Sequence, residues 1–165
     1  MSEKKIVQRN SKIHGSGVFA TAPIAKGETV VEYTGRLLSH EEADEIYGGE
    51  DTGHTFLFIL NDDYVIDANV GGGIAKWINH GCAPNCKAWI ITDPGKDPKK
   101  DRVEIEALRD IAPGEELTYD YEITIDAPLT AAERKLWACH CGTPNCTGTM
   151  LHVQRKKHKR TAATA

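Results

Sequence analysis

The sequence predicts a mainly β fold, with small sheets and few short helices, whose C-terminal segment is held to the body by a metal. Short runs rich in β-branched and aromatic residues recur between turn signals, and helical patterns are few and short. Cys139, Cys141 and Cys146 fall within eight residues near the C-terminus, and two more cysteines lie far upstream. A structural zinc site takes four ligands, so three clustered cysteines imply that this segment folds back onto an upstream ligand.

Length and composition are those of one ordinary globular domain. The chain has 165 residues, of which 40% are hydrophobic and 27% are charged, so it can bury a proper core. Its apolar runs are too short to span a membrane, and residues 1–5 do not begin a signal peptide. We expect a cytoplasmic protein, or a nuclear one if its source is eukaryotic. In such a reducing compartment, clustered cysteines more often bind a metal than form disulfides.

Charge is divided unevenly along the chain. Residues 152–165 carry five of the 20 basic residues and no acidic residue. The remaining 15 basic residues face 24 acidic ones in residues 1–151, which gives the body a net charge of −9. An acidic body favours a basic partner. The residues from about 153 onward have nothing to pack, so we expect a disordered basic tail.

Turn signals divide the chain into short elements. The runs at 16–20 and 29–33 are predicted to be strands. Ser39 and Glu42 form a capping box, which predicts a short helix over 40–48. The remaining predicted elements are a hairpin of 56–60 with 64–66, a helical stretch at 74–78, paired strands at 87–92 and 102–108 around a polar loop at 93–98, a strand at 116–121 and a helix at 130–137.

Six short motifs follow one another along the chain. They are His14-Gly15-Ser16-Gly17, Tyr33-Thr34-Gly35, Val65-Ile66-Asp67-Ala68, Asn79-His80-Gly81-Cys82-Ala83-Pro84-Asn85-Cys86, Gly114-Glu115-Glu116-Leu117-Thr118-Tyr119-Asp120-Tyr121 and Cys139-x-Cys141-x4-Cys146. With these motifs in this order, the chain resembles the SET-domain family of protein-lysine methyltransferases over residues 5–151. The resemblance implies small curved β-sheets around a knot-like core, in which the 116–121 strand passes near the 79–86 loop. It divides the chain into a SET domain at 5–125, a post-SET zinc-binding segment at 126–151 and the tail at 152–165.

The resemblance implies methyl transfer from S-adenosylmethionine to a lysine side chain. The amine must first lose its proton, although its free pKa is about 10.4, and a narrow apolar channel promotes this loss by desolvation. Tyr121 corresponds to the family's catalytic tyrosine. Tyr119 corresponds to its Phe/Tyr switch position, where a tyrosine crowds bulkier methylated amines and implies mainly monomethylation. Ordinary aromatic packing on one face of a strand would explain the same Tyr-x-Tyr spacing.

The cofactor contacts implied by the resemblance come from separate parts of the chain. They are His14, Gly15, Ser16, Gly17, Phe56, Asn79 and His80. Taken alone, the two glycines indicate a tight turn, and Asn79-His80 a turn asparagine followed by a histidine with ordinary hydrogen bonds.

Cys82, Cys139, Cys141 and Cys146 are the predicted ligands of one structural zinc ion. The alternatives are buried free thiols or a redox pair. Cys86 is the odd cysteine, which we expect to pack in the core, and it would substitute for Cys82 if Cys82 were not a ligand. Because the zinc site would hold the C-terminal segment over the cofactor, chelation should reduce both activity and stability.

Four positions depart from the family's motifs: Phe56, Gly73, Lys76 and Gly81. They leave open a degenerate SET domain that binds a basic peptide without catalysis. A zinc-stapled nucleic-acid binder that uses the basic tail is a further alternative, although the acidic body argues against it. The favoured interpretation is a monomeric lysine methyltransferase that acts on a basic, lysine-containing protein such as a histone, and not on nucleic acid or at a membrane.

Overall fold

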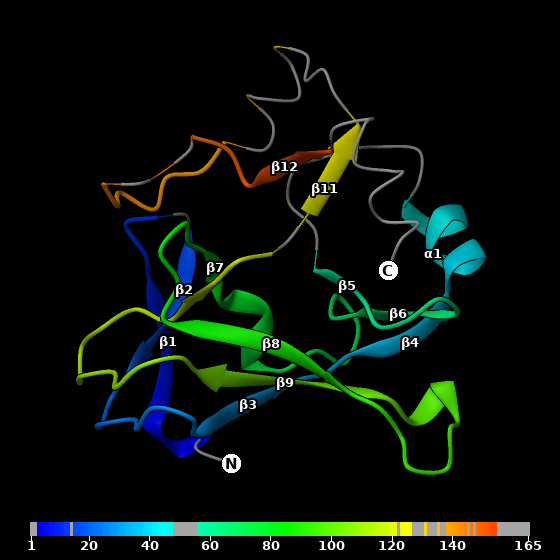
Figure 1. The fold of residues 1–165 in the computed structure, drawn as a ribbon, viewed down its shortest axis with the longest axis horizontal. Coiled ribbons are helices and arrows are strands. Elements are labelled where there is room, and N and C mark those ends of the chain that lie inside the picture. The colour runs from blue at the N-terminus through cyan, green and yellow to red at the C-terminus, as the bar shows by residue number, and fades with distance from the viewer. Residues whose placement is uncertain are drawn as a thin grey trace, which may run out of the picture.

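Small sheets of two or three strands make up most of the regular secondary structure (Figure 1). The computed structural model describes residues 3–13, 15–47, 56–121, 123–126, 131, 135, 138–144, 146 and 148–154. Short helices accompany the strands: η1 (Glu3–Lys5), α1 (His40–Tyr47), η2 (Ile74–Trp77) and η3 (Pro98–Lys100). The predicted mainly β fold with few short helices is therefore confirmed.

An N-terminal hairpin joins β1 (Ile6–Asn10) to β2 (Ser16–Ala20) in antiparallel register. The Ser11 N–H donates to the Gly15 carbonyl oxygen (2.7 Å), and Gly15 adopts a φ of +44°, which a residue without a Cβ adopts readily. Sequence analysis predicted β2 but missed β1, whose polar residues face outward.

A three-stranded antiparallel sheet, in the order β3-β9-β8, carries much of the core. Its strands are β3 (Thr29–Tyr33), β9 (Arg102–Ala107) and β8 (Cys86–Ile91), which confirms the predicted pairing of the last two to within a residue at each end. Alternate residues of β9 are buried, so one face of the sheet packs inward. Cys86 lies in this core as predicted, and its burial raises the pKa of its thiol to about 12.

A second three-stranded sheet supports helix α1. It contains β4 (Arg36–Ser39), β6 (Tyr64–Asp67) and β5 (Leu57–Ile59), and the β5–β6 hairpin is the one predicted. The capping box at the start of α1 is also present. The Ser39 N–H donates to Glu42 Oε1 (2.9 Å), and the Glu42 N–H donates to Ser39 Oγ (3.1 Å). The predicted end of this helix at residue 48 lies outside the described residues.

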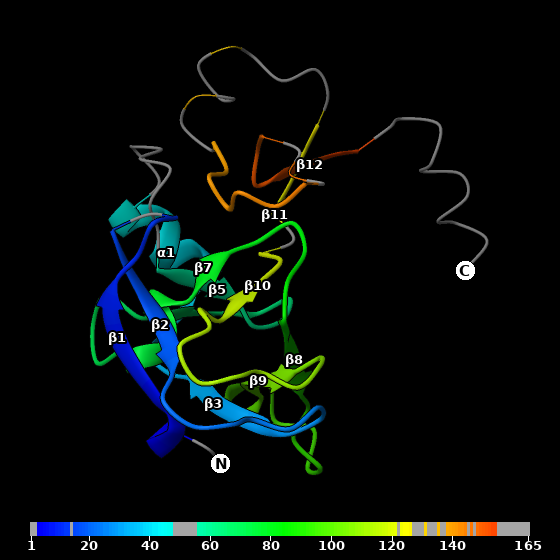
Figure 2. The same cartoon turned by 90° about the vertical axis from the view of Figure 1, so that its left-hand side faces the viewer.

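Two pairs of parallel strands lie toward the end of the molecule opposite the N-terminus. Strand β7 (Asn79–His80) pairs with β10 (Thr118–Tyr119), and β11 (Ile123–Asp126) pairs with β12 (Leu151–Gln154). Figure 2 shows β7 and β10 side by side, with β11 and β12 beyond them. The predicted strand over 116–121 is therefore wrong in length, because only Thr118 and Tyr119 form the strand, while Glu116 makes an isolated bridge with Phe19.

The C-terminal part also differs from the sequence prediction. Residues 153 and 154 belong to β12, so the expectation of disorder from residue 153 was wrong there, because pairing with β11 satisfies their backbone. Residues 155–165, and most of the helix predicted over 130–137, lie outside the described residues. No helix within the described part of the chain is long and apolar enough to cross a membrane.

Candidate active site and metal centre

The side chain of Asn85 strengthens the junction between β7 and β10. Its amide donates to the Glu116 carbonyl oxygen (2.9 Å), and its Oδ1 accepts from the Thr118 N–H (2.9 Å). Asn85 is buried, and a buried amide that lost these partners would be costly. These bonds place the 116–121 segment beside the 79–86 loop, as the sequence analysis predicted.

Tyr119 and Tyr121 lie beside each other at this junction, with ring centroids 4.9 Å apart. The Tyr121 hydroxyl donates to the Ile78 carbonyl oxygen at 2.6 Å, which fixes the position of its oxygen. Burial, with a contribution from neighbouring tyrosines, raises the pKa of both phenols far above neutral pH. Both hydroxyls therefore remain protonated and can orient a ligand, but they are poor bases.

His80 connects the tyrosine pair to the cysteine cluster. Its Nδ1 accepts a hydrogen bond from the Tyr121 N–H (3.1 Å), so this nitrogen carries no proton. Asp120 Oδ1 lies 3.7 Å from the same nitrogen, but a neutral imidazole forms no ion pair with it. On the other side of the ring, Nε2 lies 3.8 Å from Cys82 Sγ. The buried ring thus links the backbone of the predicted catalytic residue to a predicted zinc ligand.

Asn79 is held by two acceptors from different segments. Its Nδ2 donates to the Ser16 carbonyl oxygen (3.0 Å) and to Glu116 Oε2 (2.9 Å). The same Glu116 carboxylate accepts from the Ser11 hydroxyl (2.8 Å to each oxygen). The structure therefore brings the Gly-x-Gly element and Asn79 together, as the cofactor prediction requires. Of that element, His14 lies outside the described residues.

Phe56 belongs to an aromatic group next to this site. Its ring meets that of Trp77 edge to face, with centroids 5.1 Å apart. Lys76 Nζ lies 5.5 Å from the centroid of Phe56 and 5.1 Å from that of Trp77, within the range of cation–π attraction. Phe56 and Trp77 also pack against the main core. Lys76, one of the four unusual positions, is therefore held by the rings of two neighbours.

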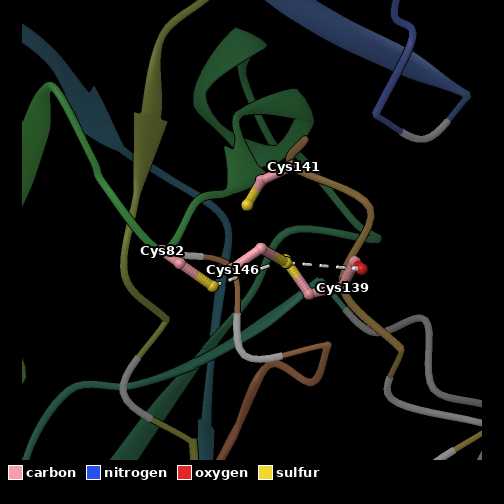
Figure 3. A group of neighbouring side chains, drawn as sticks. All are labelled: Cys82, Cys139, Cys141 and Cys146. Atoms are coloured by element: carbon pink, nitrogen blue, oxygen red, sulfur yellow. Dashed lines mark hydrogen bonds between the residues drawn. The ribbon is translucent and has the colours of Figure 1, made fainter. Parts of the chain in front are cut away.

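The four predicted zinc ligands converge (Figure 3). The sulfur atoms of Cys82, Cys139, Cys141 and Cys146 all lie within 4.8 Å of one another, and the Cys82 and Cys139 sulfurs are 3.7 Å apart. Zinc–sulfur bonds of 2.3 Å at tetrahedral angles would separate the sulfurs by about 3.8 Å, so the donor set fits a zinc ion. Cys86 is not part of the group, so it does not substitute for Cys82.

The thiols of this cluster are not equivalent. Burial raises the pKa of Cys139, and the other sulfurs add to the effect. Burial also acts on Cys141, but hydrogen bonds from Thr143 and from the Cys82 backbone outweigh it and lower the pKa of Cys141 to about 6. A thiolate at neutral pH is the form that binds zinc.

Sequence analysis missed two carboxylates that organise this part of the molecule. Glu116 was not among the predicted site residues, although its hydrogen bond with Asn79 joins two of the predicted elements. Asp67 is fully buried and accepts hydrogen bonds from Arg36 (2.7 Å) and the Tyr47 hydroxyl (2.8 Å). Burial alone would raise the pKa of Asp67, but these donors and Asn69 lower it. Their partners are distant in sequence, so no local signal could have identified them.

The fold and the site define a class: a small β domain in which a tyrosine pair lies beside a cluster of four cysteines that could hold a metal ion. Residues 15–122 match the SET domain family, and the chain belongs to that family. A "Histone-lysine N-methyltransferase, H3 lysine-4 specific" of Candida albicans is 40% identical over 149 residues, which are 88% of this chain and 14% of that protein. A protein of the same description from Schizosaccharomyces pombe is 41% identical over 141 residues, 84% of this chain and 14% of the relative.

Solved structures agree with the family assignment. The structure titled "ctPRC2 in an autoinhibited conformation bound to S-adenosylmethionine" is 32% identical and superposes with a TM-score of 0.62. The match covers 70% of this chain and 15% of that one. This chain thus spans only a small part of the proteins that it resembles.

Proposed function

We propose that this chain is an S-adenosylmethionine-dependent protein-lysine methyltransferase that produces mainly monomethyl-lysine. The observation that carries the proposal is the Tyr121 hydroxyl, held at 2.6 Å by the Ile78 carbonyl immediately before Asn79. This bond holds a protonated phenol between the 116–121 segment, which carries the predicted catalytic pair, and the segment predicted to bind the cofactor.

The residues around Asn79 suit a ligand with hydrogen-bond donors. The Asn79 amide is fixed in one orientation by Ser16 and Glu116, so its oxygen end faces away from these two acceptors. S-adenosylmethionine is a sulfonium ion with an amino-acid end, and it is bound in the similar structure cited above. When bound, it supplies the methyl group as an electrophile.

The chain's own residues would select and orient the lysine amine. An ammonium ion has no lone pair, so it must lose its proton before it can attack carbon. Removal from water favours this loss, and the buried Tyr119 ring and the half-buried Tyr121 ring provide apolar walls. Their hydroxyls, which stay protonated, can direct the amine without acting as bases. Positioning and electrostatics then account for most of the acceleration.

Tyr119 supports the monomethyl product. Tyr119 is only 5% exposed and lies against Tyr121. On this proposal, its hydroxyl would take up space that a dimethylated amine needs. The closely packed interior gives a larger amine little room without a shift of one of the rings.

The substrate class follows from charge and from the relatives. A body with a net charge of −9 attracts basic segments, and the two curated relatives are named for lysine 4 of histone H3. We propose a basic, lysine-containing segment of a histone or histone-like protein as the substrate, which would place the enzyme with chromatin in a eukaryotic cell. We propose a monomer as the active form.

Titration calorimetry with S-adenosylmethionine tests the proposal most directly. Zinc-loaded protein should bind the cofactor, Asn79→Ala should bind it much more weakly, and Tyr121→Phe should keep most of the affinity. Incubation with core histones and tritiated cofactor, followed by mass spectrometry, should then identify monomethylated lysine. Absence of binding by the parent protein would refute the methyltransferase and favour a basic-peptide binding module.

A further inference from the structure

The Glu116 side chain lies where three segments of the chain meet. Its carboxylate accepts from the Ser11 hydroxyl at the end of the first hairpin and from the Asn79 amide on β7. In the described part of the chain, the donors that it meets are neutral, and the ion pairs formed there do not include it. Neutral hydrogen-bond donors, and not an opposite charge, therefore hold this half-buried carboxylate.

The backbone of Glu116 is fixed on both sides. It forms an antiparallel bridge with Phe19, and its carbonyl oxygen accepts from Asn85. The next residue, Leu117, donates its N–H to the Val18 carbonyl oxygen (2.8 Å) and is fully buried. The carboxylate is therefore presented from a rigid part of the core.

Gly17 allows this carboxylate to approach. A Cβ at position 17 would run into the Glu116 carboxylate and lie 2.9 Å from Ser11 Cβ, so these side chains would have to move from their present positions. The backbone at Gly17 does not have a positive φ, unlike that at Gly15. The two glycines of the motif therefore have different roles. Gly15 makes the turn, and Gly17 leaves room for Glu116.

Glu116 also determines which way the Asn79 amide faces. Both Ser16 O and Glu116 Oε2 are acceptors, so only the nitrogen end of the amide can face them. The oxygen end must point elsewhere. Without Glu116, the amide would lose one of these two acceptors, and rotation about the side-chain bonds would be less restricted.

We infer that Glu116 is a positioning residue for the cofactor, which acts through Asn79 by fixing the orientation of its amide. The inference rests on the proposed function, because it takes the S-adenosylmethionine site to include Asn79. It predicts that the hydrogen-bond acceptor at position 116 matters more than its charge.

Calorimetry with S-adenosylmethionine on three variants tests this distinction. Glu116→Ala should weaken binding on the order of 10-fold, as expected for loss of a hydrogen bond to a charged group. Glu116→Gln retains an acceptor oxygen and should restore affinity to within about threefold of the parent. Glu115→Gln is the matched control, because Glu115 is exposed and pairs with Arg109 (3.0 Å). Equal losses in Glu116→Ala and Glu116→Gln would show that charge matters instead, and would overturn the inference.

A double-mutant cycle shows whether Glu116 acts through Asn79. In an Asn79→Ala background, Glu116→Ala should change the dissociation constant by less than about twofold. A full further 10-fold loss would mean that Glu116 acts independently of Asn79, which contradicts the proposal.

A cofactor-free measurement separates this inference from the proposed function. In ¹⁵N-labelled protein, the Asn79 side-chain NH₂ should give a dispersed pair of NMR signals. The chemical shifts of this pair should move toward those of a free amide in Glu116→Ala but not in Glu115→Gln. Unchanged signals in Glu116→Ala would refute the positioning role, whether or not the parent protein binds the cofactor.

Discussion

The β7–β10 junction and the cysteine-bearing segment at residues 138–154 bound the same candidate site, but they are held by different forces. At the junction, Asn79, His80, Asn85 and Tyr119 are buried, and side chains satisfy the backbone across it. In the cysteine-bearing segment, Cys139 is buried, but most other residues whose burial is described are exposed or only half-buried. The Cys139–Gly148 and Cys146–Thr143 backbone bonds are local to that segment.

This difference indicates that one half of the site depends on folding of the core and the other on binding of a metal. A junction built from buried hydrogen bonds forms as the core folds. A segment with little buried surface needs another source of stability, and four thiolates around a metal provide one. His80 lies between the two regions, with Tyr121 on one side and Cys82 on the other. Loss of the metal should therefore affect the tyrosine site through this ring.

The largest effect is expected from loss of a zinc ligand. Cys141→Ser should abolish stoichiometric zinc binding and reduce methyltransferase activity more than 10-fold, because the segment loses its main constraint. Zinc content by mass spectrometry and limited proteolysis of the 138–154 segment are the measurements. Cys86→Ala is the control, since Cys86 is buried outside the cluster and should retain the metal. Full activity in zinc-free protein would show that the junction suffices without the segment.

A large effect on the chemical step, but not on cofactor binding, is expected from a substitution at the β7–β10 junction. Tyr121→Phe removes the hydroxyl that donates to Ile78 and should lower kcat by roughly 100-fold, as loss of an oriented polar group in an active site does. Cofactor affinity and zinc content should stay near those of the parent. Single-turnover kinetics measures the rate of the chemical step, and calorimetry measures the affinity for the cofactor. A comparable loss of cofactor affinity would place Tyr121 in binding and not in catalysis.

The sequence alone predicted the local features whose geometry is determined by a short motif. The capping box at Ser39, the β5–β6 hairpin and the cysteine spacing were predicted because each depends on residues that are close in sequence. Strand β1 was missed because its residues are mainly polar, and Glu116 was missed because its partners lie 37 and 105 positions away. Tertiary hydrogen bonds of this kind leave no periodic signal in a single sequence.

A smaller effect, visible in the product and not in stability, is expected at the switch position. Tyr119→Phe should allow dimethyl-lysine to accumulate, because removal of the hydroxyl enlarges the space around the amine. Mass spectrometry of peptides after prolonged incubation is the measurement, with Tyr64→Phe as the matched control on β6. If the variant still stops at monomethyl-lysine, Tyr119 does not limit the product.

The smallest expected effect is a pH dependence of the free energy of unfolding that arises from Tyr119 at the β7–β10 junction. Burial raises the pKa of Tyr119 above its unfolded value of about 10, so the folded state holds this proton more tightly. The associated stabilisation is complete below pH of about 10 and is lost as the pH rises toward the folded-state pKa. Between pH 9 and 11 (approximate limits set by the free phenol), the free energy of unfolding of the parent should therefore fall more steeply than that of Tyr119→Phe. The expected difference is on the order of 1 kcal/mol, measured by urea denaturation of zinc-loaded protein. Equal slopes would show that the Tyr119 hydroxyl is reached by water in solution, and that the junction is less closed than its burial indicates.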